Sequence, residues 1–141
     1  MEASSASKAI QCVVVTPERT VVDESVDFVA VPMFDGELGV LAGRAPMIGR
    51  LGPGELRTRK GNVVRRYFVD GGFAQVRANT VTVLTPRAKK AEEIKPQELE
   101  PILQGKGTAK GEAKLKAQQR ARIQMRIARR AGGEEPAAHH H

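Results

Sequence analysis

Few side chains in this sequence are suited to chemistry, and they do not form a catalytic set. The only histidines are His139, His140 and His141 at the carboxyl end, so no imidazole base is spaced to activate a nucleophile. The sequence contains no GxxxxGK[ST] phosphate loop, no HExxH and no cysteine pair for a metal. Asp35 and Glu37 are near enough to pair as carboxylates, but acidic residues at turns are usually solvated. We therefore expect a protein that is not an enzyme and that holds neither a cofactor nor a metal.

The single cysteine, Cys12, lies in the apolar run Ile10–Val15, which has the residue types of a β-strand. With no second cysteine an internal disulfide is impossible, which agrees with a reducing compartment. A cysteine within an apolar strand is usually packed and inert. We expect Cys12 to be a core residue rather than a nucleophile.

Positive charge is concentrated near the carboxyl end. The formal net charge is +7, of which residues 1–105 contribute +1, residues 106–130 contribute +8 and residues 131–141 contribute −2. A nearly neutral body with a basic arm indicates an acidic partner for the arm. Nucleic acid is one such partner, because Arg and Lys neutralise phosphates, although the arm has no aromatic residue for base stacking. An acidic protein surface is a second, and a solvated helix without any partner is the third interpretation of the arm.

Short β-branched runs alternate with turn signals from Ile10 to about Thr85, and this pattern predicts a β-sandwich domain over residues 10–86. Gly52-Pro53-Gly54 and Asp70-Gly71-Gly72 predict breaks at which the chain turns, and Lys60-Gly61-Asn62 predicts a hairpin. The expected core positions are Val14, Phe28, Val40, Leu51, Val69, Val76 and Val81.

From Pro86 onward Ala, Lys, Glu, Gln and Arg replace Val and Thr, which predicts a C-terminal helical domain over residues 87–131. A short helix at about 96–104 begins with a proline, and a long basic helix spans about 108–131. The fold class is β+α: an N-terminal antiparallel β-sandwich followed by a C-terminal helical hairpin. We expect residues 1–9 to be a flexible amino terminus. Residues 132–141 are expected to be a disordered tail whose histidines are typical of a purification tag.

Several motifs occur in an order and spacing that resemble the epsilon subunit family of rotary ATP synthases. Each motif alone is weak, but together they cover most of the sandwich, and a β domain followed by helices also agrees. The motifs are Gly36-Glu37-Leu38-Gly39, Gly43-Arg44-Ala45-Pro46, Leu51–Arg57, Tyr67–Val76 and Asn79–Leu84.

The resemblance implies a non-catalytic central-stalk (rotor) subunit of a proton-translocating ATP synthase. Such a subunit couples rotation between the c-ring and the catalytic head through the gamma subunit. The implied partners are gamma, the c-ring and the alpha/beta head, with no nucleic acid and no direct membrane insertion. The implied location is peripheral, on the cytoplasmic face of the bacterial plasma membrane. The alternative function is a small nucleic-acid-binding module that uses the basic C-terminal helix.

The resemblance also assigns roles to individual residues. Asp35, Gly36 and Glu37 would contact the c-ring, and Arg44 and Pro46 would lie at the interface of the sandwich with gamma. The C-terminal helices would inhibit ATP hydrolysis through a set of arginines on the long helix. These are Arg120, Arg122, Arg126, Arg129 and Arg130.

Some bacterial members of the family carry an I/L-D-x-x-R-A motif that binds ATP on the first C-terminal helix. The aligned positions here are Leu99, Glu100, Leu103 and Gln104, so the Asp and the Arg of the motif are both missing. We therefore expect no specific ATP binding.

Overall fold

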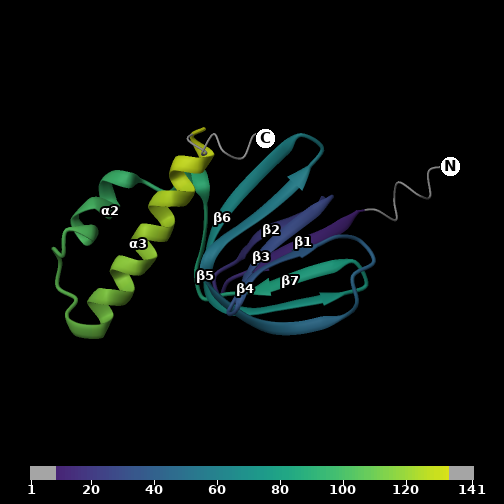
Figure 1. Ribbon diagram of the computed structural model, residues 1–141, viewed down its shortest axis with the longest axis horizontal. Coiled ribbons are helices and arrows are strands. Elements are labelled where there is room, and N and C mark those ends of the chain that lie inside the picture. The colour runs from purple at the N-terminus through teal and green to yellow at the C-terminus, as the bar shows by residue number, and fades with distance from the viewer. Residues whose placement is uncertain (1–8, 134–141) are drawn as a thin grey trace.

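The computed structural model describes residues 9–133, and it has a β-sandwich with a helical hairpin packed against one side (Figure 1). The β+α fold class is confirmed. The strands are β1 (Ile10–Val15), β2 (Thr20–Val26), β3 (Phe28–Met33), β4 (Gly36–Val40), β5 (Met47–Lys60), β6 (Val63–Arg77), β7 (Thr80–Leu84) and β8 (Ala88–Lys90). The helices are the 3-10 turn η1 (Ala91–Glu93), α2 (Pro96–Leu103) and α3 (Gly111–Ala131).

Hydrogen-bonded neighbours follow the order β2-β1-β7-β6-β5-β3-β4, with β8 added beside β6. All pairs are antiparallel except β1 with β7, where Cys12 is opposite Val81. This parallel pair joins the first strand of the sandwich to the seventh. The expectation of a purely antiparallel sandwich therefore needs this one correction.

The two predicted breaks in the middle of the sandwich are wrong. Gly52-Pro53-Gly54 lies inside β5 and Asp70-Gly71-Gly72 lies inside β6. The two glycine-rich stretches face each other, since Leu51 pairs with Gly72 and Pro53 pairs with Asp70. The pairing register is the same on both sides of this stretch, so the long β5–β6 hairpin continues through it instead of reversing. The predicted hairpin turn at Lys60-Gly61-Asn62 is confirmed.

The core of the sandwich is aliphatic, and six of the seven predicted core residues are buried. Phe28 is the exception. It is only half-buried because it is the first residue of β3, paired with Arg59 near the hairpin end. The Arg59 guanidinium lies 5.7 Å from the centre of the Phe28 ring, so a cation rather than the core covers that ring.

The helical hairpin forms a second, smaller apolar cluster on the outside of β6. Its buried members include Phe68 of β6, Ile94 after η1, Leu99 of α2, and Met125 and Ile127 of α3. Figure 1 shows α3 beside β5 and β6, with α2 on the side of α3 that faces away from the sandwich. The expected short helix is α2, and the expected long helix begins at Gly111, three residues later than predicted.

Strand β8 lies where only helix was expected. Ala88 pairs with Val69, and Lys90 pairs with Tyr67. Ala-Lys-Lys has little intrinsic preference for a strand, so the free edge of β6 decides this conformation. The expected flexible amino terminus and the expected tail lie, apart from Ala9, Gly132 and Gly133, outside the described residues.

Candidate functional site

The corner between β3 and β4 contains Asp35, Gly36 and Glu37, and all three are exposed. Gly36 has a φ of +136°, which a residue with a side chain rarely adopts, so glycine allows this tight reversal. Glu37 Oε2 accepts a hydrogen bond from Arg57 Nη1 at 3.2 Å. Because the Glu37 side chain is 53% exposed, this ion pair contributes little stability and leaves the corner free to contact a partner.

The corner borders a hollow of about 510 Å³ that is also lined by Arg44, Met47 and Arg50. Two predicted sites therefore adjoin: the stretch assigned to the c-ring and the Arg44 assigned to gamma lie around one hollow. Pro46 is exposed but does not line it. The Arg50 guanidinium lies 4.8 Å from the centre of the exposed Phe34 ring. The lining of this hollow is both charged and apolar.

An exposed apolar face on β5, β6 and β7 was not predicted from the sequence. Phe73 pairs with both Arg50 and Leu84, and Ile48 is two residues from Arg50 on the same face. We call Ile48, Phe73 and Leu84 the outer apolar face; their exposed fractions are 69%, 52% and 53%. A sequence signal existed, because Phe73 and Leu84 are out of phase with the buried Ala74, Val76 and Val83. Exposed side chains of this size in a cluster mark a docking surface.

The arginines of α3 divide into two sets. Arg130 Nη1 donates to Glu55 Oε1 at 2.6 Å, and Arg120 Nε lies 3.8 Å from Asp70 Oδ2. Arg122, Arg126 and Arg129 are exposed, and none makes an ion pair with any residue in the range 9–133. The structure therefore separates the five predicted arginines into two that pair with sandwich carboxylates and three that are exposed, of which Arg126 also lines a hollow shared with Glu37 and Pro53 of the sandwich.

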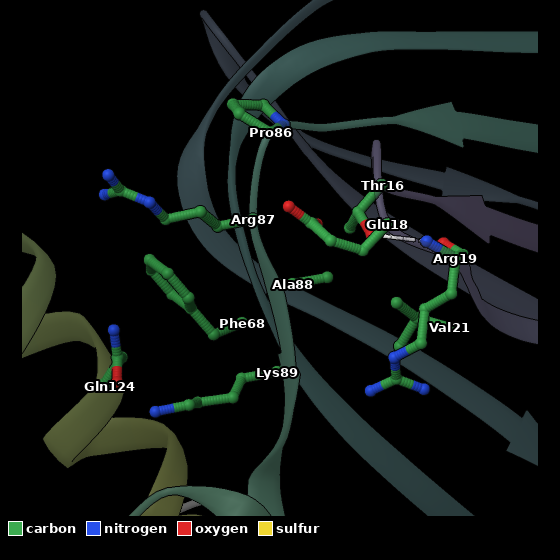
Figure 2. A pocket seen from close by; sticks show the side chains of 10 residues that line it. All are labelled: Thr16, Glu18, Arg19, Val21, Phe68, Pro86, Arg87, Ala88, Lys89 and Gln124. Atoms are coloured by element: carbon green, nitrogen blue, oxygen red, sulfur yellow. Dashed lines mark hydrogen bonds between the residues drawn. The ribbon is translucent and has the colours of Figure 1, made fainter.

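A hollow of about 430 Å³ follows the junction between the sandwich and α3. Figure 2 shows Arg87 and Lys89 on either side of Phe68, with Gln124 of α3 opposite them. Glu18 and Arg19 line the other side, and the Thr16 hydroxyl accepts a hydrogen bond from the Arg19 backbone N–H at 3.4 Å. Helix α3 is therefore incompletely packed along this edge.

The cysteine is buried, as expected. Burial, reinforced by the nearby carboxylates of Glu24 and Asp23, raises the pKa of the Cys12 thiol to about 12. Burial is also the main cause that raises the pKa of Tyr67 to about 12. At neutral pH the Cys12 thiol is protonated and is not a nucleophile.

Two of the four residues aligned with the ATP-binding motif pack in the apolar cluster. Leu99 is buried in the second cluster, Leu103 is packed against that cluster, and the Leu103 carbonyl accepts a hydrogen bond from Gln118 Nε2 at 3.5 Å. Glu100 and Gln104 are exposed. Absence of ATP binding stays a prediction.

Across residues 9–133, no His, Cys, Asp and Glu side chains gather in a group able to hold a metal ion. Over that same range, no helix combines the length and apolarity needed to cross a bilayer.

Taken together, the geometry defines a class: a β-sandwich that offers docking surfaces and carries a basic helical arm on one outer face. Residues 9–91 match the family model of the ATP synthase delta/epsilon chain, β-sandwich domain. The chain belongs to this family.

Two relatives support this family assignment. An ATP synthase epsilon chain of Rhodopirellula baltica is 68% identical over 80 residues, which are 57% of this chain and 62% of the relative. The epsilon chain of Maridesulfovibrio salexigens is 44% identical over 81 residues, 57% of each chain. The chain thus spans about three fifths of the length of these relatives.

Two solved structures have a similar fold. A chain in the OSCP/F1/c-ring structure of the Euglena gracilis mitochondrial ATP synthase aligns with a TM-score of 0.65 at 26% identity, covering 89% of this chain and 81% of that one. A chain of the central stalk and c-ring of the Tetrahymena thermophila mitochondrial enzyme aligns with a TM-score of 0.57 at 17% identity, covering 84% of this chain and 96% of that one. The second likeness shows the fold alone.

Proposed function

We propose that this chain is a non-catalytic central-stalk subunit of a proton-translocating ATP synthase. In this role it couples rotation between the c-ring and the catalytic head through gamma. The observation that carries the proposal is the family match across the whole sandwich. The likeness to a chain of a solved F1/c-ring assembly over most of its length supports it. The protein is then peripheral, on the cytoplasmic face of the bacterial plasma membrane.

Two surfaces of the sandwich suit the two rotor partners. The outer apolar face is the surface we assign to gamma, because its large exposed side chains gain most from being covered. Arg44 and Pro46 would extend this interface toward the corner. Asp35, Gly36 and Glu37 form an exposed polar corner that we assign to the c-ring.

The helical arm is the regulatory part of this proposal. Released from the sandwich, α3 would carry five arginines into the catalytic head and inhibit ATP hydrolysis by binding acidic surfaces there. Arg122, Arg126 and Arg129 need no rearrangement to meet such a surface, since they are exposed already.

Co-purification with gamma tests the proposal. The chain should bring down the gamma subunit of its own enzyme, and Phe73→Glu should reduce the captured amount at least tenfold by placing a charge in the outer apolar face. Val64→Glu is the matched control, because Val64 is 45% exposed but lies near the β5–β6 hairpin tip. No capture of gamma by the parent chain, or equal capture by the two variants, would contradict the assignment.

The alternative of a nucleic-acid-binding module receives no support from the family match or from the relatives. Two of the five arginines on α3 are also paired with sandwich carboxylates. A steep loss of DNA or RNA binding with rising salt would be needed to revive it.

A further inference from the structure

We propose that α3 is held on the sandwich by a two-point ionic clasp, in which Glu55 and Asp70 each bind an arginine of the helix. This clasp acts together with the apolar contacts around Phe68 and tunes how readily the arm leaves. Its regulatory meaning rests on the proposed function, but the clasp is a property of the isolated chain and is tested there.

The first point of the clasp uses both oxygens of one carboxylate. Glu55 Oε2 accepts from Arg66 Nη1 at 2.7 Å, and Glu55 Oε1 accepts from Arg130 Nη1 at 2.6 Å. The Glu55 side chain is only 10% exposed. Hydrogen bonds between charged groups at such distances are the strong ones, and a site shielded from water strengthens them further.

The second point also joins one carboxylate to a sandwich arginine and a helix arginine, but through a single oxygen. Asp70 Oδ2 lies 3.4 Å from Arg87 Nη1 and 3.8 Å from Arg120 Nε, and the Asp70 side chain is 15% exposed. Arg120 and Arg130 are ten residues apart, about 15 Å along a helix, so the two points hold α3 near both ends of its buried stretch. The longer distances make this second point the weaker of the two.

The register of the sheet explains why both carboxylates face the helix. Glu55 is paired with Phe68, and Arg66 and Asp70 are two residues to either side of Phe68. Side chains two apart on a strand share a face, so Phe68 forms an apolar centre with charged residues around it. The apolar side chains that α3 buries on this face are Ala121, Met125 and Ile127, with Ile123 and Ala128 partly buried beside them.

The clasp can open without leaving an unpaired charge on the sandwich. Each carboxylate already has a partner from the sandwich itself, Arg66 for Glu55 and Arg87 for Asp70. The large penalty for stranding a buried charge therefore does not oppose release. Because each carboxylate of the clasp keeps a sandwich arginine when α3 leaves, the helix can dock and dissociate repeatedly.

The test compares neighbouring arginines of the full chain by hydrogen exchange of the backbone amides of residues 121–131. Arg130→Gln removes the first point, whereas Arg129→Gln removes a charge from the same last turn without touching the clasp. Both lose the same favourable interaction with the helix dipole, so any difference reports docking. We expect Arg130→Gln to speed exchange about tenfold at low salt, as expected for one lost charge-assisted bond, and Arg129→Gln to change it less than twofold.

Salt and the second point complete the test. At about 1 M NaCl, where screening acts over roughly 3 Å between exposed charges, the parent should move toward the exchange rate of Arg130→Gln without reaching it, because a pair shielded from water is screened less. Arg120→Gln should have a smaller effect than Arg130→Gln but a larger one than its exposed control Arg122→Gln. Equal exchange for Arg130→Gln and Arg129→Gln, together with equal exchange for Arg120→Gln and Arg122→Gln, would show that apolar packing alone holds the helix. Neither result depends on whether the chain binds gamma, so failure of the clasp and failure of the proposed function are distinguishable.

Discussion

At the scale of single residues, burial decides the chemistry of the two groups with raised pKa values. Cys12 and Tyr67 are both core residues, 0% and 3% exposed, and their neutral forms are favoured in the fold. A thiol and a phenol in such places stabilise by packing. They also link the stability of the sandwich to alkaline pH.

We predict that the free energy of unfolding falls between about pH 9 and pH 12, partly because of Cys12. Its pKa is about 12 in the fold against an ordinary value of 9.0, so below pH 9 the thiol is neutral in both states. Above pH 9 the unfolded chain ionises first, which favours unfolding by up to about 1.4 kcal/mol per pH unit. Urea unfolding at several pH values measures this, with Cys12→Ala as the control.

In the Cys12→Ala variant the free energy of unfolding should fall less steeply with rising pH. Tyr67 and other titrating groups would account for the remaining slope. The slopes rather than the absolute stabilities are compared, because the smaller side chain also leaves a cavity. Equal slopes of the unfolding free energy against pH in parent and variant would show that ionisation of Cys12 does not contribute.

At the scale of elements, the close approach of β6 to the end of its antiparallel neighbour β7 depends on one glycine. Gly72 has a φ of +105°, and a Cβ placed there would lie 2.9 Å from Thr85 Cα and even closer to the Leu84 carbonyl oxygen. Backbone atoms cannot move aside as a flexible side chain can. Gly72 therefore serves the close approach of two strands rather than a turn.

We predict that Gly72→Ala destabilises the protein by about 3–5 kcal/mol, from backbone strain plus overpacking. Gly43→Ala is the matched control, since Gly43 has a φ of +89° but open space around it, and it should cost about 1–2 kcal/mol. Urea denaturation followed by circular dichroism measures both. Equal losses would mean that the positive φ alone matters and that the close approach does not.

At the scale of the whole molecule, the sandwich and the arm meet through an apolar cluster around Phe68 that two charged contacts flank. Opposite ends of β6 serve the two tasks: Phe68 and Asp70 face α3, whereas Phe73 belongs to the outer apolar face. Removing the arm therefore leaves the proposed gamma surface intact.

We predict that deleting residues 106–131 raises ATP hydrolysis by the assembled enzyme several-fold while assembly and ATP synthesis persist. Replacing Arg122, Arg126 and Arg129 with Gln should achieve most of this increase, because these are the arginines free to bind the head. Steady-state hydrolysis by purified enzyme is the measurement. Parental rates in both variants would mean that the arm is only a solvated helix.

The sequence by itself determined what depends on near neighbours. Val81 and Val83 alternate with Thr80 and Thr82, and the structure buries the two valines as this period requires. The turn at Ala78-Asn79 and the helix start at Pro96 also follow from local backbone preferences. The motifs that carry the family resemblance are local as well, which is why the family could be recognised without a structure.

Only the tertiary structure decided what depends on partners distant in the chain. Taken alone, Gly52-Pro53-Gly54 predicts a break. In the fold it lies opposite Asp70-Gly71-Gly72, and both strands continue through the paired stretch. Ala88–Lys90 becomes a strand because β6 offers a free edge. The sequence does not distinguish the five arginines of α3. Two of them, Arg120 and Arg130, belong to the clasp because Asp70 and Glu55 of the sandwich lie next to them in the fold. Contacts of this kind have no local signature, because their energy arises only when the two segments meet.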